Sequence, residues 1–169
     1  VYDGRGQVIE AQRKGVKVEY DYDWQGKVSQ EVTAGNASIR RRYDRLGHLV
    51  QEERSAFGGK TLVTKQVVDY QGRVLSRTVD GNATHFTYNQ RGQVIRVAGP
   101  SVQSVDASGK VASTSAVSVM YYDVQGNRIA VQDANGHWQK SYYDVSGQKL
   151  MDVNGTGGET HYYHDALGN

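Results

Sequence analysis

Aliphatic residues recur at fixed positions after a glycine along the chain, and no segment shows a helical period. Two positions after the glycine stand Val8, Val28, Leu49, Val74, Val94 and Val111, with Arg128 and Lys149 as exceptions. Three positions after it stand Ile9, Val50, Leu75, Ile95, Ala112, Ile129 and Leu150, with Ser29 as the polar exception. The segments before the turn, such as 84–88 and 160–163, are rich in β-branched and aromatic residues. The pattern predicts short β-strands on both sides of a regularly spaced turn.

The turn carries a four-residue motif: an aspartate, two variable residues and a glycine, usually with tyrosine before the aspartate. Nine copies recur at spacings of 17 to 25 residues, which is typical of stacked repeats. An aspartate at the first position of a type I turn accepts hydrogen bonds from later backbone amides, and a glycine at the fourth takes the left-handed conformation of a bulged hairpin. The predicted structural turn residues are Asp3, Gly6, Asp23, Gly26, Asp44, Gly47, Asp69, Gly72, Asn89, Gly92, Asp106, Gly109, Asp123, Gly126, Asp144, Gly147, Asp165 and Gly168.

A second turn signal stands near the other end of several repeats. It reads Asp80-Gly81-Asn82, Asn135-Gly136, Asn154-Gly155, Gly35-Asn36 and Gly58-Gly59. Two turns in each period predict an all-β fold, an antiparallel meander of repeated hairpins. Nine hairpins correspond to about 18 strands, and open twisted sheets rarely exceed about 10 strands without curling. We therefore expect the sheet to curl into a spiral or hollow shell, with no helices of note.

The whole chain, residues 1–169, is interpreted as one repeat array of about nine hairpin units. The segment Val105–Val111 matches Val68–Val74 closely, so the region around residues 99–118 is predicted to hold two shorter, degenerate repeats and not a linker. The chain starts one residue before a motif and stops inside another, which leads us to expect flanking repeats on both sides.

Composition favours a sheet with at least one face in contact with water. Valine dominates the aliphatic residues, and the mean hydropathy is -0.66, so a thick two-layer core is hard to build. The net charge of +2 and the many strand-forming residues argue against disorder despite 20 glycines. There are no cysteines, which excludes disulfides and thiolate metal sites, and no apolar run approaches the length of a membrane span.

Six tyrosines occupy the same place in their repeats and form a predicted structural aromatic row. They are Tyr2, Tyr22, Tyr43, Tyr88, Tyr122 and Tyr143. Because alternate strands lie about 10 Å apart, each ring is expected to pack on the aliphatic residues of the strand between. The alternative is an aromatic ladder that binds a glycan. Packing is the favoured interpretation, since an aromatic stripe more often stabilises a sheet than binds a ligand.

No catalytic site, metal site or cofactor is predicted. Calcium binding is the alternative role for the aspartates, but each turn has a single carboxylate and no calcium-loop motif, so the turn role is favoured. His161 and His164 stand three apart in an expected strand, on opposite faces, which makes them poor joint metal ligands. No nucleophile, base or phosphate-loop signature appears, so we expect that the chain is not an enzyme.

Arg40, Arg41 and Arg42 form the densest basic run. In a strand these side chains alternate between faces, whereas nucleic-acid binding requires a one-sided basic stripe. Glu52 and Glu53 are expected in the next strand, where they would pair with the arginines. No nucleic-acid partner is predicted.

The Tyr-Asp-x-x-Gly unit at about 20-residue spacing, followed by aliphatic pairs, resembles the YD repeats of the Rhs family. Similar repeats occur in the B and C subunits of bacterial toxin complexes, in wall-associated toxins and in the teneurins. The resemblance covers Tyr2 to Gly168. It implies a long β-sheet that spirals into a hollow shell, which in the bacterial toxins encloses the toxic C-terminal region until delivery.

The resemblance thus implies that this chain is a structural segment of a shell that shields a toxin or effector passenger. The implied partners are that passenger and the remainder of the shell, either flanking repeats or a partner subunit. The implied location is secreted or on the bacterial cell surface, with delivery by a secretion system. The family's Asp-Pro cleavage sequence is missing, because Pro100 is the one proline and follows Gly99, so neither cleavage nor toxicity is implied here. The alternative function is a cell-surface or cell-wall carbohydrate-binding or adhesion module that uses the aromatic row.

Overall fold

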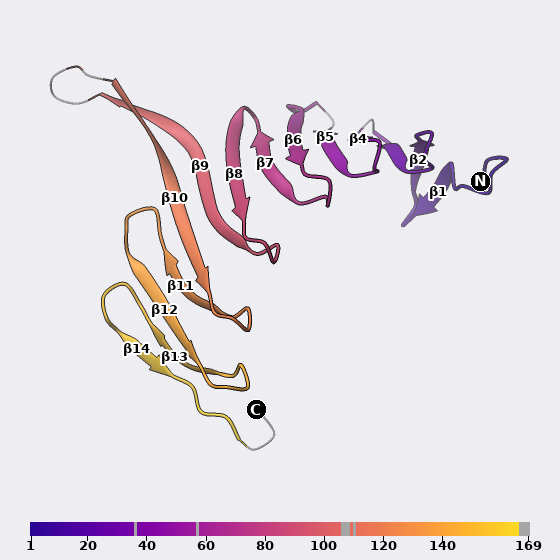
Figure 1. Ribbon diagram of the computed structural model, residues 1–169. Coiled ribbons are helices and arrows are strands. Elements are labelled where there is room, and N and C mark those ends of the chain that lie inside the picture. Colours follow the sequence, from indigo (N-terminus) through magenta and orange to yellow (C-terminus); the bar gives the residue numbers. More distant parts are fainter. Residues whose placement is uncertain (36, 57, 106–108, 110, 166–169) are drawn as a thin grey trace. The chain divides into compact units, whose positions relative to one another are not determined.

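The computed structural model describes residues 1–35, 37–56, 58–105, 109 and 111–165. In this part of the chain the regular structure is all β: fourteen antiparallel strands form one open sheet in chain order, without helices, which confirms the predicted fold class (Figure 1). The curling of this sheet into a shell stays a prediction. The contacts divide the chain into two units, Val1–Ala83 and Thr84–Asn169, which are described one after the other.

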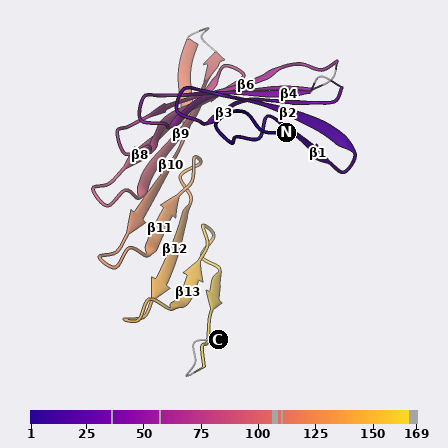
Figure 2. The ribbon, with the colours of Figure 1, turned by 90° about the vertical axis from the view of Figure 1, so that its right-hand side faces the viewer.

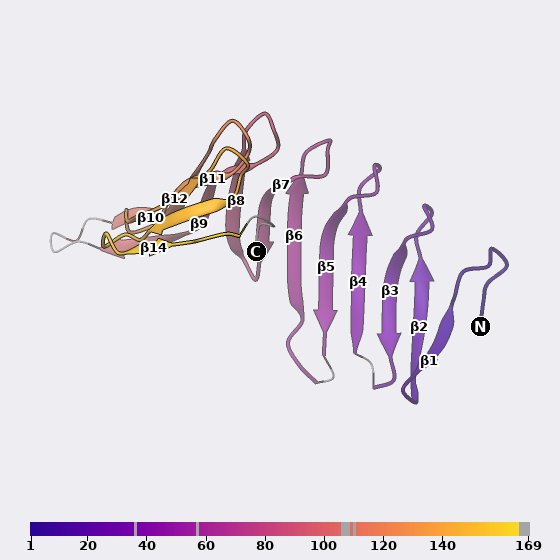
Figure 3. The ribbon, with the colours of Figure 1, turned by 90° about the horizontal axis from the view of Figure 1, so that it is seen from below.

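The first unit is a meander of short strands (Figure 3). Its strands are β1 (Glu10–Arg13), β2 (Val16–Tyr22), β3 (Val28–Thr33), β4 (Ser38–Tyr43), β5 (Leu49–Ser55), β6 (Leu62–Val68) and β7 (Val74–Val79). Strand β8 (Asn82–Tyr88) begins in the last two residues of this unit. Lys14 and Gly15 both have positive φ, 51° and 80°, as a two-residue type I′ turn between β1 and β2 requires.

The second unit contains most of β8 and the strands that follow it (Figure 2). These are β9 (Val94–Val105), β10 (Val111–Tyr122), β11 (Arg128–Gln132), β12 (Trp138–Tyr143), β13 (Lys149–Val153) and β14 (Glu159–His161). Strands β9 and β10 have 12 residues each and pair with one another along their length.

This pairing corrects the prediction of two short repeats around residues 99–118. The described residues of this region form one long hairpin, in which β9 and β10 pair from Arg96–Val119, near the motif turns, to Val105–Val111 at the other end of the strands. Gly99 and Pro100 lie inside β9, where the register with β10 shifts between Ser115 and Val117. A proline, which has no N–H, is tolerated at such an irregularity. The long hairpin also explains part of the difference between fourteen strands and the expected 18.

Little of either unit is buried. Among the described residues, only Val18 in the first unit and Ala98 in the second are buried, with relative exposures of 6% and 7%. In the halves of β2, β4, β6, β8 and β12 next to the motif turns, side chains on one face are less exposed than those on the other face. That face carries the tyrosine row and is called the row face below. Each unit is therefore a single sheet layer and has no two-layer core among the described residues.

Candidate functional site

The motif turns connect consecutive strands at one end of the strands in each unit, and this side of the sheet is called the repeat edge below. The turns share one geometry. At the turn of Asp44, the Oδ1 atom accepts hydrogen bonds from the amides of Leu46 (2.9 Å) and His48 (2.8 Å), and Gly47 N–H donates to the Asp44 carbonyl (3.0 Å). The same side-chain bonds occur at Asp3, Asp23, Asp69, Asn89, Asp123 and Asp144. The motif glycines of these turns have φ between 78° and 100°. This is a type I turn followed by a glycine bulge.

The turn hydrogen bonds favour the charged form of the aspartates. The backbone amide of the residue four positions on is the largest cause that lowers the pKa of Asp44 and Asp144 below the ordinary value, although partial burial acts in the opposite direction. For Asp123 the side-chain amide of Asn127 is the largest cause of a lowered pKa. The carboxylates thus act as structural acceptors within the turn.

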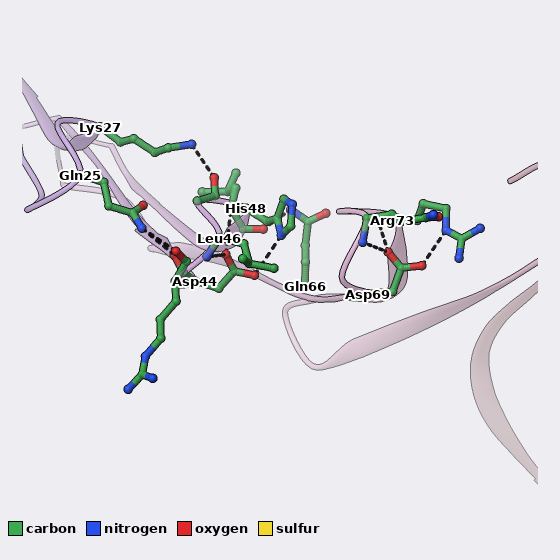
Figure 4. A network of polar contacts seen from close by, with 12 residues as sticks. Gln25, Lys27, Asp44, Leu46, His48, Gln66, Asp69 and Arg73 are labelled. Atoms are coloured by element: carbon green, nitrogen blue, oxygen red, sulfur yellow. Dashed lines mark hydrogen bonds and ion pairs between the residues drawn. The ribbon is translucent and has the colours of Figure 1, made fainter.

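Side chains of four turns, those of Asp3, Asp23, Asn89 and Asp123, also reach a following turn along the repeat edge; Figure 4 shows the links from the Asp23 turn to the Asp44 turn. The residue after the glycine bonds the carbonyl of the next motif glycine: Gln7 to Gly26 (3.2 Å), Lys27 to Gly47 (2.5 Å) and Gln93 to Gly126 (3.0 Å). The residue before the glycine bonds the carbonyl that follows the next motif aspartate: Gln25 to Arg45 (2.9 Å), Gln125 to Val145 (3.1 Å) and Arg91 to Val124. We call this set of links the turn ladder.

The turn ladder leaves little space above two of the motif glycines. A Cβ atom at Gly72 would lie 2.8 Å from Cδ2 of His48, and one at Gly47 would lie 2.8 Å from Nζ of Lys27. Both glycines also have positive φ. The backbone conformation favours glycine at both positions. At Gly72 the His48 ring also obstructs a Cβ atom, whereas at Gly47 the flexible end of Lys27 can move aside.

The tyrosine row is held by hydrogen bonds to the backbone of the preceding repeat. The hydroxyl of Tyr22 donates to the Val8 carbonyl (2.7 Å), Tyr43 to Val28 (3.1 Å), Tyr122 to Val94 (2.9 Å) and Tyr143 to Arg128 (3.3 Å). Each acceptor stands two positions after a motif glycine. The register also shifts by a bulge beside each of these tyrosines, where the strand meets the turn. The row thus links neighbouring repeats through polar bonds, which packing arguments from sequence did not anticipate.

Other members of the row differ from this arrangement. Tyr2 forms an isolated bridge with Val8 and is largely exposed. Tyr88 lies at the row position of β8, beside a bulge of the same kind. His164 stands where a tyrosine would be expected, and its Nε2 lies 2.7 Å from the Lys149 carbonyl, also two positions after a motif glycine. The row predicted from sequence contains only tyrosines and does not include His164.

The second unit uses the same turn at its opposite edge. Asp133 Oδ1 accepts from the amides of Asn135 and His137, and Asn154 Oδ1 accepts from those of Thr156 and Gly158. The residues with positive φ are Gly136 and Gly157. Each stands three positions after the Asp or Asn, as in the repeat motif, so the same pattern in the sequence indicates these turns. The predicted Asn154-Gly155 turn is correctly located, but Gly157 is the residue with the left-handed conformation.

Two of the predicted motif turns are described only in part. Gly109 has a φ of 80°, whereas its partner Asp106 lies outside the described residues. Asp165 is described and Gly168 is not. The turn geometry of these two motif copies is therefore left as a prediction.

Charged side chains on the row face pair across strands. Arg41 Nε lies 3.0 Å from Glu52 Oε2, which confirms the expected cross-strand pairing of the arginine run, and Arg54 lies 2.7 Å from the other oxygen of Glu52. The Arg54 hydrogen bond, followed by that of Arg41, lowers the pKa of Glu52. In register, Arg40 faces Glu53, but its Nε bonds Gln30 Oε1. The basic run is divided between the two faces of the sheet.

A second polar cluster, not predicted from sequence, surrounds Asp152 in the second unit. Its carboxylate accepts hydrogen bonds from Ser141 Oγ (2.6 Å), Tyr162 Oη (2.9 Å) and Lys149 Nζ (3.2 Å). The Ser141 bond is the largest cause that lowers the pKa of Asp152. The serine donates to the carboxylate, so this arrangement serves as a cross-strand connection.

Neither a metal cluster nor a membrane-spanning helix occurs among the described residues. No cluster of three or more histidines and carboxylates in this part of the chain has a spacing that would hold a metal ion. No helix of a length and hydropathy that would cross a membrane occurs there either.

Comparison with known proteins links this fold to toxin complexes. No model of a protein family and no curated protein matches the sequence. Among solved structures, the Photorhabdus luminescens Tc holotoxin pore with a TccC3 variant matches 98% of this chain at 16% identity, with a TM-score of 0.71. A crystal structure of TcdB2-TccC3 matches 98% at 15% identity with a TM-score of 0.69, and one without the hypervariable C-terminal region matches 95% at 15% with 0.62. The chain spans only 9 to 10% of these chains, and at such identities the likeness shows the fold.

Proposed function

We propose that this chain is a structural segment of a YD-repeat β-shell that encloses and shields a toxin or effector passenger in a large secreted bacterial protein. One observation carries the proposal. A chain with YD-type repeats has, over 98% of its length, the fold of part of a toxin-complex structure. The role is mechanical containment, and no catalytic activity is proposed for these residues.

The architecture of each unit suits a wall. Backbone hydrogen bonds run from strand to strand, the tyrosine hydroxyls connect each repeat to the one before, and the turn ladder connects the same repeats at the edge. A single layer with two open faces has little core of its own, so its faces are available to line a cavity on one side and to meet solvent on the other.

The proposed partners are the remainder of the shell and its passenger. Two named proteins, TcdB2 and TccC3, occur together in the similar structures, which supports a shell assembled from more than one polypeptide or from flanking repeats of the same one. Secretion and delivery to a target cell belong to the same proposal.

Cryo-electron microscopy of the chain joined to its neighbouring polypeptide would test containment. We expect a closed hollow particle with density inside and a passenger that resists added protease. A variant that strains two turns of the wall, Gly126→Val with Gly147→Val, should make the passenger susceptible, whereas Tyr142→Phe, which removes an exposed hydroxyl, should not. An open ribbon without enclosed density would refute the shell.

The glycan alternative receives no support from the tyrosine row. Four of its hydroxyls donate to backbone carbonyls, and the rings lie on the less exposed face of their strands. Aromatic residues with open polar atoms occur elsewhere in the sheet, on the face opposite to the row.

A further inference from the structure

Three large aromatic side chains lie exposed on the second unit's other face. Tyr121 is 48% exposed, Trp138 38% and Tyr142 45%. Tyr121 pairs in register with Ala130, which pairs with Lys140, and Gln132 pairs with Trp138. Because side chains alternate along a strand, Tyr121, Trp138, Lys140 and Tyr142 all project from one face, while Tyr122 and Tyr143 project from the row face. We call these four residues the aromatic platform.

Two rings of the platform form a contact that is open to solvent. The centroids of Tyr121 and Trp138 lie 5.6 Å apart, with an angle of 37° between the ring planes. The residue next to Tyr121 across the strands is Ala130, whose small side chain does not cover the rings. The pair thus presents a tilted aromatic surface that is partly open to solvent.

The polar atoms of the platform lack partners within the described chain. No hydrogen bond or ion pair joins another described residue to the hydroxyl groups of Tyr121 and Tyr142, the indole N–H of Trp138 or the ammonium of Lys140. The adjacent tyrosines of the row provide an internal comparison, since the hydroxyls of Tyr122 and Tyr143 are both bound to backbone carbonyls. The sheet therefore uses one tyrosine of each Tyr-Tyr pair structurally and leaves the other available.

Open aromatic faces surrounded by free donors suit a particular ligand chemistry. Ring faces contact the C–H surface of a sugar ring, and the hydroxyl, indole and ammonium groups bond its oxygen atoms. Lys140 stands between Trp138 and Tyr142 on the same face of β12, where its charge matches a carboxylate. Two strands away, in register with Lys140 and Tyr142, stand Glu159 and His161, whose side chains lie 3.2 Å apart.

We infer that the aromatic platform binds a saccharide that carries a carboxylate, such as a uronic-acid oligomer. Trp138 and Tyr121 supply the stacking surface, and Lys140 selects the acid. A purely apolar partner fits less well, because it would bury four unpaired polar groups. The inference does not depend on the proposed shell, since the platform is complete within β10, β11 and β12.

Fluorescence titration of the full chain would test this site. The chain has two tryptophans, so a Trp24→Phe background leaves Trp138 as the sole indole reporter. We expect tetragalacturonate to change the Trp138 emission in a saturable manner, and neutral cellotetraose to bind at least tenfold more weakly. Lys140→Gln should weaken acid binding by about tenfold, or 1.4 kcal/mol.

Calorimetry on variants of the native chain completes the test. Trp138→Ala should abolish binding of tetragalacturonate, while the matched control Trp24→Ala, which removes an exposed tryptophan at a turn of the first unit, should leave it unchanged. Circular dichroism would verify that each variant retains its sheet. Absence of binding, equal binding of the neutral sugar, or full binding by a folded Trp138→Ala variant would each overturn the inference.

Discussion

At the scale of single residues, the motif aspartate and glycine have separate tasks. The aspartate satisfies two amides of the turn, and the glycine supplies the left-handed residue and makes room for a side chain of the preceding turn. Gly147 separates these tasks well, because a Cβ there would meet nothing closer than Asn127 at 3.8 Å. Its φ of 85° is then the main constraint.

We predict that Gly147→Val lowers the free energy of unfolding by about 1–2 kcal/mol, the cost of a left-handed conformation for a residue with a Cβ atom. Gly147→Asn should cost less, since asparagine tolerates positive φ. Urea unfolding followed by circular dichroism would compare them. Equal losses for valine and asparagine would show that backbone conformation is not the deciding factor.

The second residue-scale prediction concerns pH. The pKa of Asp44, Asp123 and Asp144 is lower in the folded chain than the ordinary value of 3.8, so these groups stabilise the fold above that pH. The stabilisation is lost as the pH falls through the lower, folded pKa. The melting temperature should therefore decline steeply below about pH 4.

Asp144→Asn would isolate one contribution to this acid sensitivity. Asn89 occupies the same position in its own turn and accepts the same two amides without titrating. The variant should therefore fold, with a shallower decline of melting temperature in acid than the parent chain. A decline as steep as the parent's would assign the acid sensitivity to other groups.

At the scale of elements, the tyrosine row joins hairpins that are consecutive in the chain. Tyr121 and Tyr122 offer a matched pair for measuring this link, because they are neighbours on opposite faces and only Tyr122 bonds the backbone. Tyr122→Phe should lower the free energy of unfolding by about 0.5–1.5 kcal/mol, the net value of one hydrogen bond. Tyr121→Phe should change it by less than about 0.5 kcal/mol. Equal effects in urea unfolding would remove the hydrogen bond as the explanation.

Much of the element structure follows from local sequence. Turn residues and alternating strands have local causes, so the antiparallel meander was predictable. The long β9–β10 hairpin was not, because a motif-like segment is compatible with either edge, and only pairing over 12 residues decides which edge it occupies. The tyrosine bonds were also missed, since they depend on the cross-repeat position of a carbonyl and not on the residue type of Val8 or Val94.

At the scale of the whole molecule, the chain exposes an unusual amount of surface. Its accessible area is 11901 Å², whereas a compact monomer of 18.7 kDa would expose about 8,300 Å². Unfolding therefore uncovers less new surface than it does in a compact protein. We predict a urea m-value clearly below that of compact proteins of the same length, since m scales with the area exposed on unfolding.

Sedimentation of the same samples is needed to interpret the m-value. A low value in a monomeric sample would agree with an uncovered single layer. A value typical of compact proteins, again in a monomer, would contradict it.

The turn ladder has a consequence for how such chains lengthen and diverge. In the second unit, Arg91 reaches the Val124 carbonyl across 33 residues, whereas Gln125 reaches the Val145 carbonyl across 20, and both carbonyls belong to the residue after a motif aspartate. The additional residues of the longer repeat are accommodated entirely towards the opposite edge. Insertions and deletions can thus accumulate on that side without changing the spacing of the repeat edge. A foreign peptide or domain is best grafted between β9 and β10, beyond the pair Val105–Val111.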